Sequence, residues 1–202
     1  MQGMQQGNPV PVRERTRRAV RTELALLAQG LFTARGYDQT TLDDFVAAAG
    51  LSKRTFFRYF SSKEDLVLGK YEMFGDALTE ALAARPADEP IWAALRRAFD
   101  VVADYFDDPA HHTQAVAMEK IIHDTPALSA GEWERVSRVQ NQLLTMVRDR
   151  TGQHDPADPR PATITGAAMA CVMAAKTAWI TSNQAHSFND LLDRAMAAVK
   201  PT

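Results

Sequence analysis

The chain has 202 residues, of which 24% are charged and 46% hydrophobic, and its formal net charge is -2 at pH 7. This balance excludes a disordered or fibrous chain and predicts a folded globular protein. We expect a cytoplasmic protein without a membrane segment, because there is no run of about 18 uncharged apolar residues and no signal-peptide core. The single cysteine, Cys171, cannot form an intrachain disulfide, which fits a reducing compartment.

The charges are distributed unevenly along the sequence. Residues 1–63 carry ten Lys and Arg against five acidic residues, a net +5, whereas the rest of the chain is at -7. A basic segment of this kind suits a polyanion such as nucleic acid, although a solvated charged face is a common alternative.

The first predicted element is a polar arm over residues 1–12, followed by an amphipathic helix from Glu14 to Ala34. The arm is interpreted either as a solvated tail or as a tether that brings the arginines after it, Arg17 among them, to phosphates or into a minor groove. Gly36 ends the helix.

Two short helices follow. Thr41 is a predicted N-cap, with Asp44 three residues later completing a capping box, and Gly50 is the stop. Ser52 is predicted to cap a second short helix that runs to Phe60.

Beyond this pair the sequence is helical throughout. Ser62 is predicted to cap a long helix that extends to about Ala84. The further predicted helices span residues 90–106, 110–123, 129–151, 160–185 and 188–199. We therefore predict an all-α fold of about nine helices, without internal repeats.

The two short helices, joined by a turn that contains glycine, have the form of a helix-turn-helix. Phe56 and Phe60 form the predicted buried stripe of the second helix, which leaves basic, hydroxyl and aromatic side chains at its surface. Arg and Lys donate to guanine edges, Thr contacts either face of a base pair, and Tyr donates to phosphate. The sequence therefore favours DNA binding, the alternative being a helical hairpin with a solvated basic face.

The segment RGYDQTTLDDFVAAAGLSKRTFFRYFSSKEDL resembles the TetR family of transcription regulators nearly position by position, and the resemblance covers about residues 13–70. It implies an N-terminal helix-turn-helix domain over residues 13–62 and a helical ligand-binding and dimerisation domain over residues 63–202. The sequence departs from the family at Arg54, where Gly is frequent, and at Phe57, where Tyr is frequent. Arg54 offers a base contact that Gly lacks, and Phe57 can contact a thymine methyl.

The resemblance also implies the roles of individual residues. Thr41 would contact the DNA backbone, the second helix would enter the major groove, and Tyr59 and Lys63 would hold phosphates. The complete predicted DNA-binding set is Arg17, Thr41, Ser52, Lys53, Arg54, Thr55, Phe57, Arg58, Tyr59 and Lys63.

For the carboxy-terminal domain, the resemblance implies a homodimer formed by the last two long helices. Small residues between Gly166 and Ala178 would let helix axes approach closely. The predicted interface residues are Ala168, Cys171, Ala175, Phe188, Leu191, Leu192, Ala195 and Met196. The alternative is that both helices are core within one subunit.

A ligand pocket is also implied, and its candidates are the large or polarizable side chains of the middle helices. They are Trp92, Phe99, Met118, His123, Trp133, Met146, Met169, Met173 and Trp179. Side chains of these types fill protein interiors more often than they line pockets. A metal site at His111, His112, Glu119 and His123 is a weaker alternative, and we expect no metal or other cofactor.

These predictions combine into a repressor that is released from a palindromic operator by a small hydrophobic ligand. Its expected partners are double-stranded operator DNA, a second copy of the chain and a small-molecule effector. An enzyme is not expected, because the sequence has no nucleophile with a base and no phosphate-cradling loop. A helical adaptor that binds protein is a third class, which would leave the basic bias unexplained.

Overall fold

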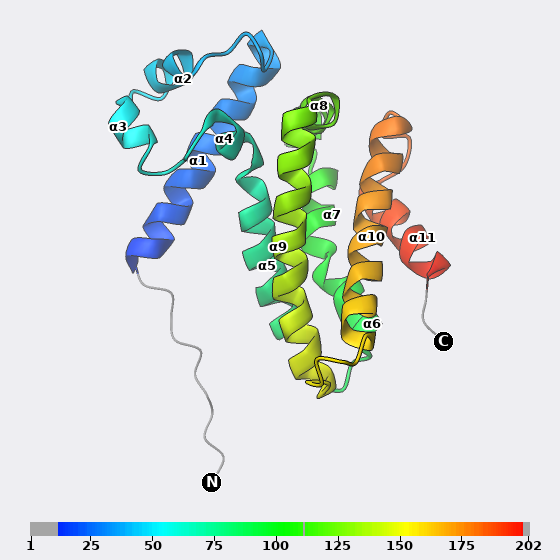
Figure 1. Ribbon diagram of the computed structural model, residues 1–202. Helices are drawn as coiled ribbons and strands as arrows, with labels where there is room; N and C mark the ends of the chain where they lie inside the picture. The colour runs from blue at the N-terminus through cyan, green and yellow to red at the C-terminus, as the bar shows by residue number, and fades with distance from the viewer. Residues whose placement is uncertain (1–11, 111, 200–202) are drawn as a thin grey trace. The chain divides into compact units, whose positions relative to one another are not determined.

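A computed structural model describes residues 12–110 and 112–199, and all regular structure in these ranges is helical (Figure 1). It contains eleven helical segments, two pairs of which are separated by a single residue, Gly69 or Phe99. Counting each such pair as one gives the nine predicted helices, and the all-α prediction is confirmed. The predicted arm lies outside the described residues except for Val12, which begins the first helix.

The chain divides into two compact units, Met1–Gly69 and Lys70–Thr202. The predicted boundary, by contrast, lies between residues 62 and 63. The helix that follows residue 62 packs against the first helix of the chain, so it is part of the first unit.

The first unit contains four helices: α1 (Val12–Arg35), α2 (Leu42–Ala48), α3 (Lys53–Phe56) and α4 (Lys63–Leu68). Its core is aromatic, because Phe45 packs edge-on against Phe56 with ring centroids 5.7 Å apart, and Phe56 stacks on Phe60 at 5.6 Å. Edge-to-face and offset stacking are the favourable geometries for such rings. This core holds α2 and α3 although each is too short to be stable alone.

The predicted caps of the first unit are confirmed. Thr41 and Asp44 form a capping box at α2, and Ser52 and Ser62 accept hydrogen bonds from the third residue of α3 and α4. Gly50, in the turn between α2 and α3, has φ +63°, a conformation in which a Cβ is unfavourable. α3 is shorter than predicted: it ends at Phe56, and residues 57–59 continue as turns in which Arg58 and Tyr59 donate to carbonyls three residues earlier.

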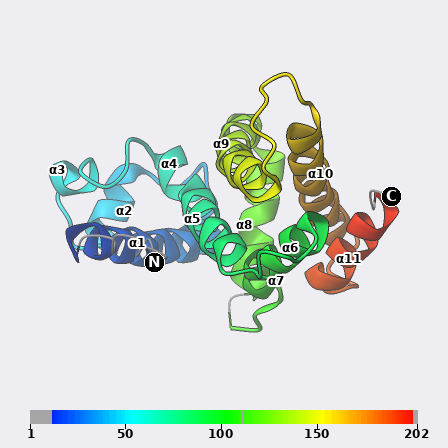
Figure 2. The same ribbon diagram turned by 90° about the horizontal axis from the view of Figure 1, so that it is seen from below.

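The second unit is a helical bundle (Figures 1 and 2). Its segments are α5 (Lys70–Ala83), α6 (Ile91–Ala98), α7 (Asp100–Asp107), α8 (His112–Asp124), α9 (Pro126–Thr151), α10 (Arg160–Thr181) and α11 (Phe188–Ala198). α9 packs between α5 and α10, while α11 lies against α10 and α7. α5 lies close to α9 at Gly75, where an added Cβ would be 2.8 Å from the Gln142 side chain.

α10 is a long and predominantly apolar helix. By length and composition alone it is long and apolar enough to cross a membrane, with an 18-residue window of mean hydropathy 1.3. Trp179 and Met169, however, are buried in the bundle, and its one interior cation, Lys176, is paired with carboxylates. These contacts identify α10 as a core helix of the second unit.

Candidate nucleic-acid interface and cavity

The exposed surface of α3 and the turns after it is basic and aromatic. Lys53, Arg54, Phe57 and Arg58 are exposed, and Phe57 retains 55% of its surface, which is unusual for a phenylalanine. On the opposite side, Phe56 has no exposed surface. The predicted division between a buried stripe and an exposed basic face is therefore present in the structure.

Two basic side chains of this face have partners in the first unit that a phosphate or base could replace. The Lys53 ammonium is 2.7 Å from Oδ1 of Asp43, and both side chains are more than half exposed. Arg58 donates to the Tyr59 hydroxyl at 3.0 Å and lies over its ring. Exposed pairs of this kind contribute only about 0–1 kcal/mol, so exchanging the partner costs little.

The caps also fix the hydroxyl groups of the predicted interface. The Thr41 hydroxyl donates to Asp44 at 2.6 Å, and its hydrogen bonds lower the pKa of this carboxyl. The Ser52 and Thr55 hydroxyls are hydrogen-bonded to each other at 2.9 Å. Thr41 and Ser52 are exposed, so each lies at the surface as predicted. The hydroxyl of each, however, already accepts the capping hydrogen bond of its helix.

The Lys63 ammonium already has partners within the first unit, unlike a lysine that is free to bind phosphate. Its ammonium donates to the carbonyl of Tyr37 and lies 3.8 Å from the centre of the Tyr37 ring. Burial lowers the pKa of Lys63, against the raising effect of nearby acids. This side chain ties the start of α4 to the loop before α2. Arg17, by contrast, is exposed on α1 as the prediction requires.

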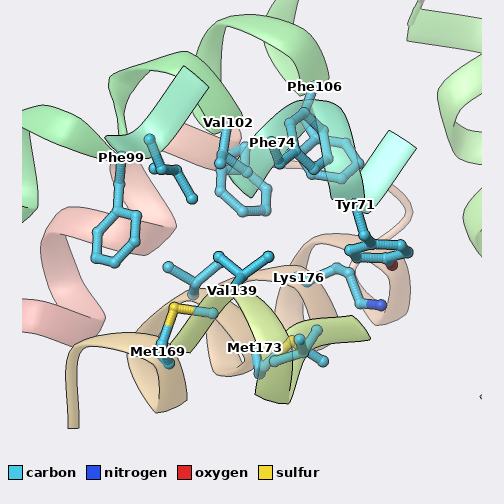
Figure 3. A pocket seen from close by; sticks show the side chains of 13 residues that line it. Tyr71, Phe74, Phe99, Val102, Phe106, Val139, Met169, Met173 and Lys176 are labelled. Atoms are coloured by element: carbon cyan, nitrogen blue, oxygen red, sulfur yellow. The ribbon is translucent and has the colours of Figure 1, made fainter. Parts of the chain in front are cut away.

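The second unit contains an apolar, partly open cavity between α5, α6–α7, α9, α10 and α11 (Figure 3). It leaves about 40 Å³ for the centres of water-sized molecules. The lining residues are Tyr71, Phe74, Leu78, Phe99, Val102, Phe106, Val136, Val139, Met169, Val172, Met173, Lys176 and Phe188. Their character suits a hydrophobic or aromatic molecule.

Three predicted pocket residues, Phe99, Met169 and Met173, line this cavity, and the other six do not. Met118 and Trp179 are fully buried elsewhere in the core, and Trp133 and His123 are exposed. Trp92 and Met146 are half-buried outside the lining. The prediction selected residues by type, whereas the helix face decides which side chains reach the cavity. Phe74, Phe106 and Phe188 lie on such faces and were missed.

At one end of the cavity is a cluster of buried charges that the sequence analysis did not anticipate. Lys70 donates to Glu119, and Lys176 donates to Glu132 and lies 3.3 Å from the second oxygen of Glu119. The Tyr71 hydroxyl also donates to Glu132. We call these five residues the charge cluster; they come from α5, α8, α9 and α10.

Two members of the charge cluster, Lys70 and Glu119, are ionised despite their burial. Burial opposes a charge on Glu119, but the two lysine ammonium groups outweigh it and hold the pKa of this carboxyl below its ordinary value. Burial likewise opposes a charge on Lys70, whose pKa the facing Glu119 nevertheless raises. Burial, and then the two carboxylates, raise the pKa of the Tyr71 hydroxyl well above its usual value. The Lys70–Glu119 pair is therefore ionised and lies beside a neutral Tyr71 hydroxyl.

The interface prediction for α10 and α11 requires correction, because most of its residues are covered within one subunit. Ala168, Phe188 and Leu192 have no exposed surface, and the Cys171 thiol lies 3.4 Å from the carbonyl of Ala195 on α11. Ala175, Leu191 and Met196 are also buried, and Ala195 is half-buried. These residues join α10 to α11 within one subunit, while other residues of α10 remain exposed.

The metal alternative is not supported either. Glu119 faces two ammonium groups, while His123 is exposed, and His111 lies outside the described residues. Within the described ranges no group of three His, Cys, Asp or Glu side chains is placed to hold a metal ion.

Two family models match the chain. Residues 27–69 match "Bacterial regulatory proteins, tetR family", and residues 89–202, more than half of the chain, match "MftR C-terminal domain". The first match covers the helix-turn-helix described above.

Named relatives belong to the same group of regulators. The chain is 32% identical over 154 residues to the HTH-type transcriptional regulator TcmR of Streptomyces glaucescens, covering 74% of this chain and 68% of TcmR. It is 26% identical over 142 residues to the HTH-type transcriptional regulator EthR of Mycolicibacterium smegmatis, covering 66% and 64%. Over 112 residues it is 30% identical to the activator FasR of the same organism, covering 55% and 48%.

Solved structures share the fold. A TetR-family regulator from Syntrophomonas wolfei superposes with a TM-score of 0.62 at 16% identity, covering 93% of this chain and 94% of the other. FadR of Bacillus subtilis, solved with stearoyl-CoA, superposes with a TM-score of 0.56 at 18% identity, covering 88% and 96%. From the family models and from TcmR, the chain belongs to the TetR family and is a DNA-binding transcription regulator of the helix-turn-helix type.

Proposed function

We propose that this regulator is a repressor that binds a palindromic operator as a homodimer and leaves it when a small hydrophobic ligand enters the cavity. The observation that carries the proposal is the exposed face of Lys53, Arg54, Phe57 and Arg58, held on a rigid aromatic core. Basic side chains and an exposed phenylalanine on a short helix suit the major groove.

Within this face we assign base reading to Lys53 and Arg54, and backbone contacts to Thr41 and Tyr59. Lys63 is proposed to act indirectly, by holding the Tyr37 loop, because its ammonium already donates to that backbone carbonyl. Phosphate contacts through Arg17, Ser52, Thr55 and Arg58 complete the proposal.

The operator should be found first, by selecting bound fragments from random duplexes, and a palindrome is expected. Gel shifts over operator variants then test the reading residues. Arg54→Ala should relax base preference at one half-site position by about 1–3 kcal/mol. Arg97→Ala is the matched control, because Arg97 is an exposed arginine of the second unit. Equal effects of both variants, or an unchanged preference in Arg54→Ala, would refute the assignment.

A homodimer is proposed because one short recognition helix reads only a few base pairs, whereas two related by a two-fold axis read a palindrome. The outer face of α10 offers an uncharged surface for it. Small residues recur there at spacings of three and four: Thr163, Ala167, Ala170, Ala174, Thr177 and Thr181. Small side chains allow helices to approach closely across a two-fold axis.

Light scattering after size exclusion tests the dimer. Ala174→Arg places a charge in the centre of this face and is expected to give monomers, which should bind the operator more weakly. Ala93→Arg, at an exposed alanine of α6, is the matched control and should leave the dimer intact. If Ala174→Arg stays dimeric, the partner contacts another face.

Release by a ligand is supported by the cavity, whose lining is almost wholly apolar. FadR, which shares the fold, was solved with a ligand that has a long acyl chain. FasR is named an activator, so the sign of regulation has to be measured. Transcription from the selected operator, with and without the chain, distinguishes repression from activation.

A further inference from the structure

The cavity has one charged side chain in its wall. Within the part of the chain that the structure describes, thirteen residues line the cavity, and Lys176 is the one with a charged side chain (Figure 3). Its ammonium is at the end of the cavity near Tyr71, where Glu132 and Glu119 both bind it. The part of Lys176 that a ligand can touch is therefore its aliphatic stem.

The positive and negative charges of the charge cluster cancel one another. Lys70 and Lys176 balance Glu119 and Glu132, and none of the four has more than a tenth of its side chain exposed. A buried ion that lacks a partner is expensive, because its hydration is lost and nothing replaces it. An anionic ligand in the cavity would add one uncompensated negative charge beside two carboxylates, and a cationic ligand would leave the opposite excess.

We propose that the cavity selects uncharged apolar ligands and that Glu132 is the residue that enforces this selectivity. The inference rests on the proposed function in one respect, that the cavity receives a ligand. Glu132 already forms an ion pair with the Lys176 ammonium, to which an acidic ligand would otherwise bind. Glu119 cannot be exchanged in the same way, because it also holds Lys70.

Displacement of a fluorescent neutral probe tests the selectivity. Phenylnaphthylamine, which brightens in apolar surroundings, is bound to the full-length protein and displaced by naphthamide or naphthoate. These two competitors are similar in size and differ by one negative charge at neutral pH. Naphthamide is expected to displace the probe at concentrations at least about tenfold lower than naphthoate.

Glu132→Gln keeps an acceptor for Tyr71 and Lys176 but leaves the charge cluster with one positive charge in excess. Naphthoate should then gain about tenfold or more in affinity, while naphthamide changes little. Glu134→Gln is the matched control, since Glu134 lies on the same helix with 73% of its side chain exposed. It should leave the affinities of both competitors unchanged.

A double variant separates charge selection from mere loosening of the core. Glu132→Gln combined with Lys176→Met restores neutrality, because Lys70 and Glu119 remain paired, and naphthoate should be excluded again. If Glu132→Gln alone does not fold, Lys176→Met serves as the second test. It removes the cation, so naphthoate should bind more weakly than to the parent protein while naphthamide still binds.

Several outcomes would overturn the proposal. The proposal fails if the parent protein binds the two competitors with equal affinity, or if folded Glu132→Gln gains no affinity for naphthoate. It also fails if the double variant still binds naphthoate, or if Lys176→Met gains affinity for naphthoate. If phenylnaphthylamine does not bind at all, the cavity is not a ligand site. Operator binding is measured without any ligand, so the DNA-binding part of the proposed function would survive each of these failures.

Discussion

Two ion pairs, one in each unit, lie in opposite environments. In the first unit, Lys53 and Asp43 pair in solvent, with more than half of each side chain exposed. In the second, Lys70 and Glu119 pair with 2% and 0% of their side chains exposed. A solvated pair is weak and exchangeable, whereas a buried pair cannot lose one member without leaving an uncompensated charge. The first arrangement suits contact with a changing partner, and the second fixes the positions of helices.

The largest expected effect is at the buried pair. Glu119→Ala leaves Lys70 without its carboxylate and should lower the free energy of unfolding of the second unit by about 3–5 kcal/mol. All three tryptophans, Trp92, Trp133 and Trp179, are in this unit, so urea unfolding followed by tryptophan fluorescence reports on it selectively. Glu134→Ala on the surface of α9 should change stability by less than about 0.5 kcal/mol. Similar losses in both variants would contradict the distinction between buried and exposed charges.

The same pair predicts a pH dependence. Glu119 has a lowered pKa, so its contribution is complete above the ordinary value of 4.5 and is lost as the pH falls through the folded-state pKa. Lys70 has a raised pKa, so its contribution is complete below 10.5 and is lost as the pH rises through the folded-state pKa. The second unit should have a stability plateau between these limits. Glu119→Gln should flatten the acid side, and an unchanged acid limb would show that other groups control it.

A smaller effect is expected where α5 meets α9. Gly75→Ala adds a Cβ 3.1 Å from the buried Val139 side chain, which must shift, and the crowding outweighs the better helix propensity of alanine by up to about 1 kcal/mol. Gly166→Ala is the matched control on α10. Its Cβ would lie 3.7 Å from Gln140, an ordinary contact, so stability should rise by up to about 1 kcal/mol. Tryptophan-monitored urea unfolding compares the two variants, and equal signs would contradict the packing argument.

The smallest effect on stability is expected at the exposed pair. Asp43→Asn releases Lys53 and should change stability by less than about 1 kcal/mol. The freed ammonium should bind the selected operator more tightly at low salt, and the gain should fade at high salt. Gel shifts at two salt concentrations measure this, and weaker binding at low salt would mean that Asp43 orients Lys53 toward the DNA.

The sequence predicted most of the first unit because its determinants are local. The caps at Thr41, Ser52 and Ser62 and the turn at Gly50 each depend on residues within four positions. The spacing of Phe56 and Phe60 likewise determines which side of this segment is buried. The surface positions of Arg54 and Phe57 therefore follow from the residue pattern alone.

The second unit was harder to predict because its site joins residues far apart in the sequence. Lys70 and Glu119 are separated by 49 positions, and Glu132 and Lys176 by 44. One signal was available in Lys176, a lone charge in the middle of an otherwise apolar helix, which requires a buried partner. The error on α10 and α11 had another cause, since apolar residues that face a partner subunit look the same in sequence as those that face a neighbouring helix.

The small size of the cavity has a mechanical consequence. About 40 Å³ holds a few water molecules, whereas pockets for small molecules usually measure about 300–1,000 Å³. A ligand must therefore displace the side chains that line the cavity. Met169 and Met173 are the most flexible of these side chains. Empty space that disappears on unfolding also makes a protein sensitive to hydrostatic pressure. Compression should unfold the second unit at lower pressure when the cavity is empty than when a ligand fills it.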